Sequence, residues 1–116
     1  MRNANDFFGS HNGTVHYFRH TLSHFLYTDA VNELATECGA YWLIDLIISH
    51  QCNPLVMAES FQVWQLKRVE KNAFYILCTD GNDNKVTSQD IPYSDFPFDT
   101  VTIWCIDGIL LFPSEY

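Results

Sequence analysis

The spacing of apolar residues changes once along the chain, near Asn53. Apolar residues recur at helical spacing over 29–38, and the stretch 40–50 is apolar on nearly all sides. Beyond Asn53 a period of two appears, first at 61–66 and 73–78. A helix that is apolar all round must be buried, and the later strands can bury it. The pattern predicts an α+β fold, with N-terminal helices packed on one face of a four- to five-stranded antiparallel sheet.

Capping and turn residues indicate the boundaries of these elements. Thr28 or Asp29 can cap the first helix, and Gly39 closes or kinks that helix at its carboxyl end. Residues 15–27 fit either a helix or a strand. Glycine, asparagine and aspartate favour turns. Turns are therefore expected at 79–84 and 107–108, with further strands at 86–91, whose polar residues suggest a sheet edge, at 101–105 and at 109–112.

Length and composition suit a single domain over residues 1–116. Hydrophobic residues make up 47% of the chain, enough for one core without a metal or disulfide. No CxxC pair occurs, so we expect free thiols at Cys38, Cys52, Cys78 and Cys105. The longest apolar run, 40–48, is far shorter than the roughly 20 residues of a membrane span. The sequence therefore predicts a cytoplasmic protein without a cofactor.

Acidic residues are concentrated in the second half of the chain. The protein has 14 acidic and 6 basic side chains, a formal net charge of -8. Residues 76–116 contain seven acids and one base, which gives this segment a net charge of -6. That balance argues against direct binding to nucleic acid or an anionic membrane, both of which need a basic face. The acids expected at turns and strand ends are Asp80, Asp83, Asp90, Asp95, Asp99 and Asp107.

These acids suggest a binding surface for a protein with a basic groove. Displayed carboxylates attract grooves lined by lysine and arginine, including those that normally hold a nucleic-acid backbone. Nearby aromatic residues would be the apolar anchors of such an interface: Tyr93, Phe96, Phe98 and Trp104. The alternative is that the acids form only a solubilising coat.

Histidines and one aspartate indicate a different kind of site. His16, His20 and His24 are spaced four residues apart, so a helix would place three imidazoles on one face, as in zinc-binding helices. A strand would hold them too far apart to chelate a metal. Asp45 interrupts the most apolar helix and must be paired or solvated, with Arg19 and His20 as plausible partners. The chain has no nucleophile elbow and no phosphate-binding loop.

Several short strings together resemble one known family. They are Gly13-Thr14, Tyr17-Phe18-Arg19-His20, Tyr27-Thr28-Asp29-Ala30-Val31, Gly39-Ala40-Tyr41-Trp42-Leu43-Ile44-Asp45, Phe61-Gln62-Val63-Trp64 and Leu111-Phe112-Pro113-Ser114-Glu115-Tyr116. Over almost its whole length the chain is similar to a family of short, uncharacterised bacterial proteins, a domain of unknown function often carried on phages, plasmids and other mobile elements. Among the spaced histidines only His20 matches that family's pattern, which weakens the metal interpretation. The resemblance implies no reaction.

The interpretation that combines these features is a small acidic protein-binding domain without enzymatic activity. Its most specific form is an inhibitor of a host nucleoprotein defence complex, similar to an anti-CRISPR protein, whose carboxylates occupy a basic nucleic-acid groove. Two other classes stay open. One is a small metal-dependent or acid-base enzyme that uses His20 and Asp45, and the other is a homodimeric accessory protein whose exposed aromatic residues pair with each other.

Overall fold

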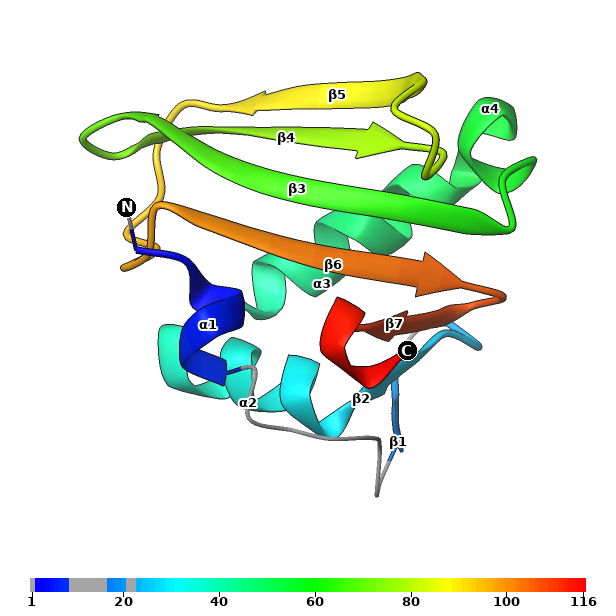
Figure 1. Cartoon of the computed structure of the whole chain (residues 1–116), viewed down its shortest axis with the longest axis horizontal. Coiled ribbons are helices and arrows are strands. Elements are labelled where there is room, and N and C mark those ends of the chain that lie inside the picture. Colours follow the sequence, from blue (N-terminus) through cyan, green and yellow to red (C-terminus); the bar gives the residue numbers. More distant parts are fainter. Residues whose placement is uncertain (1, 9–16, 21–22) are drawn as a thin grey trace.

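Seven β-strands form one mixed sheet at the centre of the structure (Figure 1). The computed structural model describes residues 2–8, 17–20 and 23–116. The strands are β1 (Tyr17–Arg19), β2 (Leu26–Thr28), β3 (Phe61–Glu70), β4 (Ala73–Thr79), β5 (Lys85–Ile91), β6 (Thr100–Ile106) and β7 (Ile109–Leu111). Their order across the sheet is β1-β2-β7-β6-β3-β4-β5, and β2 and β7 are the parallel pair among otherwise antiparallel neighbours.

The fold is α+β, but the sheet is larger than predicted and is not purely antiparallel. The predicted strands correspond to β3 through β7, and the edge position of β5 is confirmed. The two additional strands come from the segment that fitted either a helix or a strand. Each has three residues, too few to display a two-residue period. β2 joins the sheet through Leu26 and Tyr27, which pair in parallel with Ile109 and Leu110.

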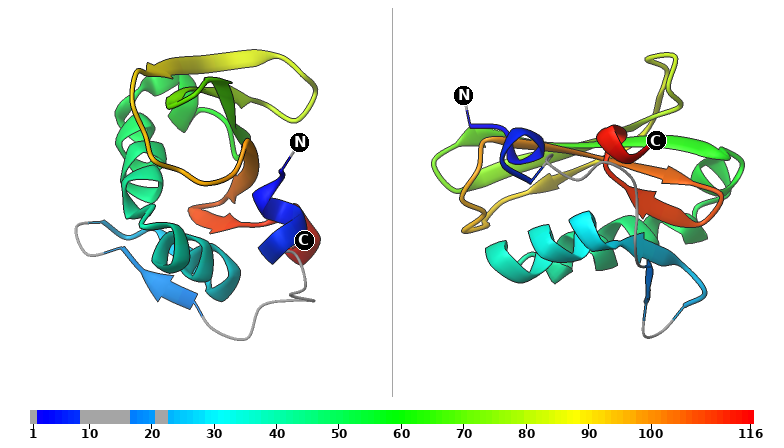
Figure 2. Two further views of the ribbon diagram at one scale, coloured as in Figure 1. Left: turned by 90° about the vertical axis from the view of Figure 1, so that its left-hand side faces the viewer. Right: turned by 60° about the horizontal axis from the view of Figure 1, so that its bottom comes forward.

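Helices lie on both faces of the sheet (Figure 2). On one face are α2 (Asp29–Cys38) and α3 (Tyr41–Ser49), followed by the 3-10 helix η1 (His50–Cys52) and by α4 (Pro54–Met57). The short helix α1 (Ala4–Phe8), which the sequence did not predict, and the 3-10 helix η2 (Pro113–Glu115) lie on the opposite face, so the expectation that the N-terminal helices pack on one face is wrong for α1. Thr28 caps α2 by accepting a hydrogen bond from the Val31 N–H, and Gly39 ends that helix with a left-handed φ of 59°. Both features were predicted from the sequence.

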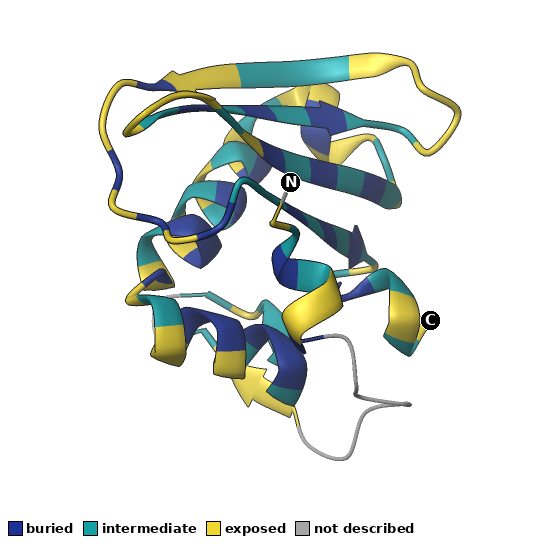
Figure 3. Ribbon diagram, turned by 60° about the vertical axis from the view of Figure 1, so that its left-hand side comes forward, coloured by how far each residue is buried: buried dark blue, intermediate teal, exposed yellow. Residues whose placement is uncertain are grey.

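The core lies between the sheet and the layer formed by α2 and α3. Along β4, β6 and the first six residues of β3 every second residue is buried, an alternation visible in Figure 3. The large buried side chains of these strands include Trp64, Leu66, Phe74, Ile76 and Ile103, and those of α3 are Leu43, Ile44 and Ile47. Burying one such side chain contributes roughly 1.5–3 kcal/mol. The sheet therefore supplies most of the stability of α3, as expected for a short helix that is apolar on most of its surface.

A pair of buried glutamines joins η1 to β3. Gln51 and Gln62 exchange two hydrogen bonds, because each Nε2 donates to the Oε1 of the other residue, at 2.8 and 2.9 Å. Trp64 Nε1 donates to the same Gln62 Oε1 at 2.9 Å. Gln62 Nε2 also lies 3.0 Å from the carbonyl oxygens of Val56 and Glu59. These contacts satisfy several polar groups inside the core and tie the segment around α4 to the sheet.

Candidate functional site

The sheet face opposite α2 and α3 contains a groove of about 400 Å³. Its floor comes from the residues of β3, β4 and β6 that alternate with the core residues: Val63, Gln65, Thr79, Thr102 and Trp104. Its walls come from the N-terminal segment, η2 and the β4–β5 turn: Asn3, Asn5, Pro113, Gly81 and Asp83. We call this surface the open sheet face. Asn5 ties α1 to one side of it by pairing with the backbone of Thr102, at 2.6 and 2.7 Å.

An aromatic cluster lies at one side of the open sheet face. The Trp104 ring centroid is 5.0 Å from that of Phe61 and 5.5 Å from that of Tyr116, and Tyr116 is exposed. Gly81 packs directly against Phe61, where a Cβ would lie 3.1 Å from Cδ1 of the ring, and its φ of 89° also favours glycine. The predicted anchor Trp104 is thus half-buried and accessible from the groove.

Two of the four predicted aromatic anchors are not available on the surface. Phe96 and Phe98 are only 1% and 5% exposed, so the expectation that they are displayed is wrong. The loop 92–99 folds inwards at alternate residues, and the Phe96 ring lies 6.0 Å from that of Phe74. The Phe98 ring lies 5.8 Å from that of Phe8 in α1. Tyr93 is 69% exposed, as predicted.

Arg68 of β3 holds this loop in place. Its Nη2 donates to the carbonyl oxygens of Phe96 and Phe98, at 2.8 and 3.1 Å, and its Nη1 donates to the carbonyl oxygen of Lys71. Its Nε forms an ion pair with Asp99 Oδ1 at 3.0 Å, and Asp99 Oδ2 accepts from the Arg2 N–H at 2.8 Å. Asp99, predicted as part of a binding surface, therefore has a structural role.

The carboxyl group of Asp99 makes the folded state sensitive to acid. The hydrogen bond from the Arg2 backbone and the contact with Arg68 lower its pKa below the ordinary value of 3.8. Its stabilising effect is present above that ordinary pKa and disappears as the pH falls through the lowered one. We expect the urea midpoint to fall between pH 5 and about pH 2, and to fall less in Asp99→Asn.

The exposed carboxylate of Asp95 in the same loop offers the matched control. Asp95→Asn removes the same charge and should keep the acid sensitivity of the wild-type chain. If acidification lowered the urea midpoint of Asp99→Asn as much as that of the wild type, the assigned role of Asp99 would be wrong.

The six predicted acids form two groups rather than one continuous surface. Antiparallel pairing of Val63 with Thr79, and of Phe61 with Ile106, brings the turn containing Asp80 and Asp83 to the same end of the sheet as Asp107. The residues at the other end are Asp90, Asp95 and Asp99. The five residue steps of β5 from 85 to 90 separate the two groups by roughly 17 Å. The closeness of these acids in the sequence suggested one patch. In an antiparallel meander, however, successive turns lie at opposite ends of the sheet, so the acids in those turns are separated.

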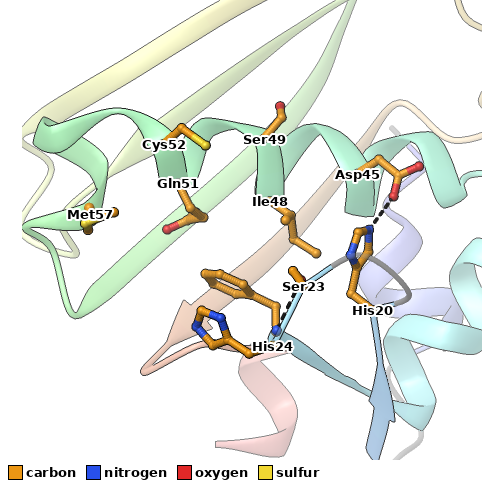
Figure 4. Close-up of a pocket in the computed structure, with 10 residues that line it drawn as sticks. His20, Ser23, His24, Asp45, Ile48, Ser49, Gln51, Cys52 and Met57 are labelled. Atoms are coloured by element: carbon orange, nitrogen blue, oxygen red, sulfur yellow. Dashed lines mark hydrogen bonds and ion pairs between the residues drawn. The ribbon is translucent and has the colours of Figure 1, made fainter.

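The predicted contact between His20 and Asp45 is present on the helix side of the sheet. His20 Nε2 lies 2.8 Å from Asp45 Oδ1, and the two side chains are 14% and 67% exposed (Figure 4). The backbone of His20 follows β1 and donates to the Phe25 carbonyl oxygen at 2.9 Å, which closes the connection to β2. Arg19, the other predicted partner, is an exposed residue of β1. His16 lies outside the described residues.

A cavity of about 690 Å³ extends from this pair along α3 and η1 to α4. Figure 4 shows Asp45 and His20 at one end and Met57 at the other, with Ile48 between them. The remaining lining residues are Ser23, His24, Phe25, Ser49, Gln51 and Cys52. The sequence indicated the His20–Asp45 pair at the polar end but not the cavity. The cavity forms because residues 23–25 pack beside η1, and no local sequence pattern indicates that contact.

The four cysteines differ strongly in accessibility, and all are free thiols. Burial raises the pKa of both Cys78 and Cys105 to about 12, so these thiols stay protonated at neutral pH. Cys52 is exposed.

We expect iodoacetamide to alkylate Cys52 in the native protein at least about tenfold faster than Cys78 or Cys105, because the thiolate is the nucleophile. Peptide mass spectrometry would measure this, and rapid native alkylation of Cys78 would contradict the buried arrangement.

The described residues bring together few groups suited to metal chemistry. Among residues 2–8, 17–20 and 23–116, no three histidine, cysteine or acidic side chains are grouped closely enough to hold a metal ion. The His20–Asp45 pair can orient an imidazole, as acid-base sites require. Its aspartate is largely in solvent, however, where water screens the carboxylate charge. The arrangement is suited to binding polar or charged groups at the edge of an apolar cavity.

Comparison with known proteins gives a family but no activity. A family model described as "Family of unknown function (DUF6876)" matches residues 2–116. No curated protein and no solved structure matches the chain. In the part of the chain that the structure describes, no helix has both the length and the apolar character needed to cross a membrane.

Proposed function

The chain belongs to the DUF6876 family of unknown function, and since that family supplies no reaction, we propose from the geometry that the protein is an acidic binding domain for a basic protein surface. The observation that carries this proposal is the position of Trp104. It lies half-exposed beside Phe61 and Tyr116 on a sheet face that has carboxylates at both ends. An apolar centre with aromatic residues and a polar rim is the usual anatomy of a protein interface.

Charge gives the partner its chemical class. Asp83 lines the groove itself, and Asp90 lies opposite Tyr75 in the register, which places Asp90 on the same face at the far end of β5. Lys67 pairs with Tyr75 on that face and Lys85 pairs with Thr79, so two lysines lie among the acids of the rim. The formal net charge of -8 adds a long-range attraction for cations. A lysine- and arginine-rich surface is the complementary partner.

In the most specific form of this proposal, the partner is a nucleoprotein complex of host defence, and the protein competes with nucleic acid for its basic groove. The two groups of carboxylates would then contact basic side chains at two places about 17 Å apart. A role in binding rather than catalysis is supported by the exposed position of Asp45, since a solvated carboxylate lacks the protected environment of most acid-base sites.

Capture from a nuclease-treated bacterial lysate, followed by purification of the captured protein, tests this proposal. We expect Trp104→Ala to weaken binding of the purified partner at least about tenfold, as for an aromatic anchor of an interface. The double variant Asp83→Asn/Asp90→Asn should weaken it several-fold at low salt and reduce its salt dependence. Fluorescence anisotropy with labelled nucleic acid would show whether the protein displaces that nucleic acid.

Matched controls lie on the opposite layer of the molecule. Leu55→Ala removes an exposed apolar side chain of α4, and Glu33→Gln/Glu37→Gln removes two charges from α2. Both should leave binding unchanged. If these controls weaken binding as much as the open-face variants, the assigned surface is wrong. If size-exclusion chromatography shows a dimer that Trp104→Ala dissociates, the open sheet face pairs with a second copy, and binding to a basic partner is refuted.

A further inference from the structure

We propose that the cavity beside α3 binds a small molecule with an apolar body and a cationic head group. This site lies on the helix side of the sheet and is independent of the open sheet face. Its volume of about 690 Å³ falls within the range of roughly 300–1,000 Å³ typical of small-molecule sites. The shape and the chemistry of its lining together define this class of ligand.

The walls of the cavity favour an apolar body. Phe25, Ile48 and Met57 supply hydrocarbon, aromatic and thioether surface. Two of the polar side chains along the walls already have partners within the protein. Gln51 is paired with Gln62, and Ser49 Oγ donates to the Leu46 carbonyl oxygen at 2.7 Å. A ligand that filled this part of the cavity would therefore gain by burying apolar surface rather than by forming new hydrogen bonds.

The end of the cavity at α3 favours a cation. Asp45 is the lining residue that carries a formal charge when the imidazoles of His20 and His24 are neutral. His20 Nε2, 2.8 Å from Asp45 Oδ1, fixes the position of the carboxylate. A carboxylate has about four acceptor sites and this contact uses one of them, so the group can also accept hydrogen bonds from an ammonium group. The position of Asp45 and His20 beside Ile48 is visible in Figure 4.

Three probes of similar size and different charge test the proposal: 4-phenylbutylammonium, 4-phenylbutan-1-ol and 4-phenylbutanoate. Binding is followed by titration with NMR and by the rate at which iodoacetamide alkylates Cys52, which lines the cavity and is exposed. Cys38, half-buried in α2 and lining a different groove, is the internal control. We expect the cation to bind best, at least about fivefold more tightly than the alcohol, and to protect Cys52 but not Cys38.

Two variants separate a local effect of Asp45 from the general attraction of an acidic protein. Asp45→Asn keeps a side-chain oxygen for His20 but removes the charge, and should reduce the affinity for the cation to that for the alcohol. Asp6→Asn removes the same charge from an exposed residue of α1, on the opposite face of the sheet, and should leave the preference unchanged. The proposal is wrong if none of the probes binds, if the alcohol or the carboxylate binds as tightly as the cation, or if the two variants behave alike. None of these outcomes bears on binding by the open sheet face.

Discussion

Replacing Arg68 with methionine is expected to lower the free energy of unfolding by about 3 kcal/mol. Methionine preserves the length and much of the apolar surface of the side chain but removes every donor. The carbonyl oxygens of Phe96 and Phe98 would lose their hydrogen bonds, and Asp99 would lose its ion pair. Equilibrium unfolding in urea at neutral pH measures the change.

The neighbouring Lys67 offers a matched control for Arg68. Lys67 is exposed and has the same charge, so Lys67→Met should change stability by less than about 0.5 kcal/mol. Arg68→Lys should give an intermediate loss, because an ammonium group cannot reproduce the planar set of donors. In Arg68→Met, amide hydrogen exchange should increase first in the loop 92–99. If Arg68→Met and Lys67→Met were equally stable, the guanidinium would not be the group that holds the loop.

Replacing Gln62 with leucine is expected to destabilise the protein by a similar amount, about 3 kcal/mol. The substitution leaves the buried Gln51 amide and the Trp64 indole N–H without their shared acceptor, while the volume of the side chain changes little. Leaving a buried polar group unsatisfied costs about 1–3 kcal/mol. Thermal and urea unfolding would measure the loss of stability. Near-ultraviolet circular dichroism would report changes in the packing of the tryptophans, Trp64 among them.

Gln65 allows the same substitution to be made on the other face of β3. Its side chain lies on the open sheet face and is only half-buried, so Gln65→Leu should be close to neutral. The double variant Gln51→Leu/Gln62→Leu should lose less stability than the sum of the two single variants, because neither amide is then left without its partner. Additive losses would show that the two glutamines are not coupled as the geometry indicates.

The elements that sequence reasoning predicted are those whose signals are local. Thr28, Gly39 and the apolar spacing between them specify α2 without reference to the rest of the chain. β3 and β4 are long enough to show their alternation, although β3 extends through charged residues to Glu70. β2 could not be predicted, since three residues show no period and its parallel partner lies more than 80 residues away.

For the candidate sites too, only features with a local sequence signal could be predicted. Asp45 drew attention because a carboxylate within an apolar helix requires a partner or solvent, and the structure provides both. Composition identified the acids of the second half, but the direction of each strand decides at which end of the sheet they lie. The exposed position expected for Phe96 is wrong because polar neighbours such as Asp95 are typical of an exposed loop. The hydrogen bond from Arg68 to the Phe96 carbonyl oxygen instead holds this loop against the core.

The pairing of early and late segments also determines when this protein can complete its fold. Asn5 contacts Thr102, 97 residues further along, and Thr28 Oγ1 donates to Glu115 Oε1 across 87 residues. Contacts of such long range slow folding, because a long stretch of chain must be ordered to form them. On a ribosome, α3 is synthesised well before the strands that bury it, so its apolar surface stays available to chaperones until β6 and β7 have emerged.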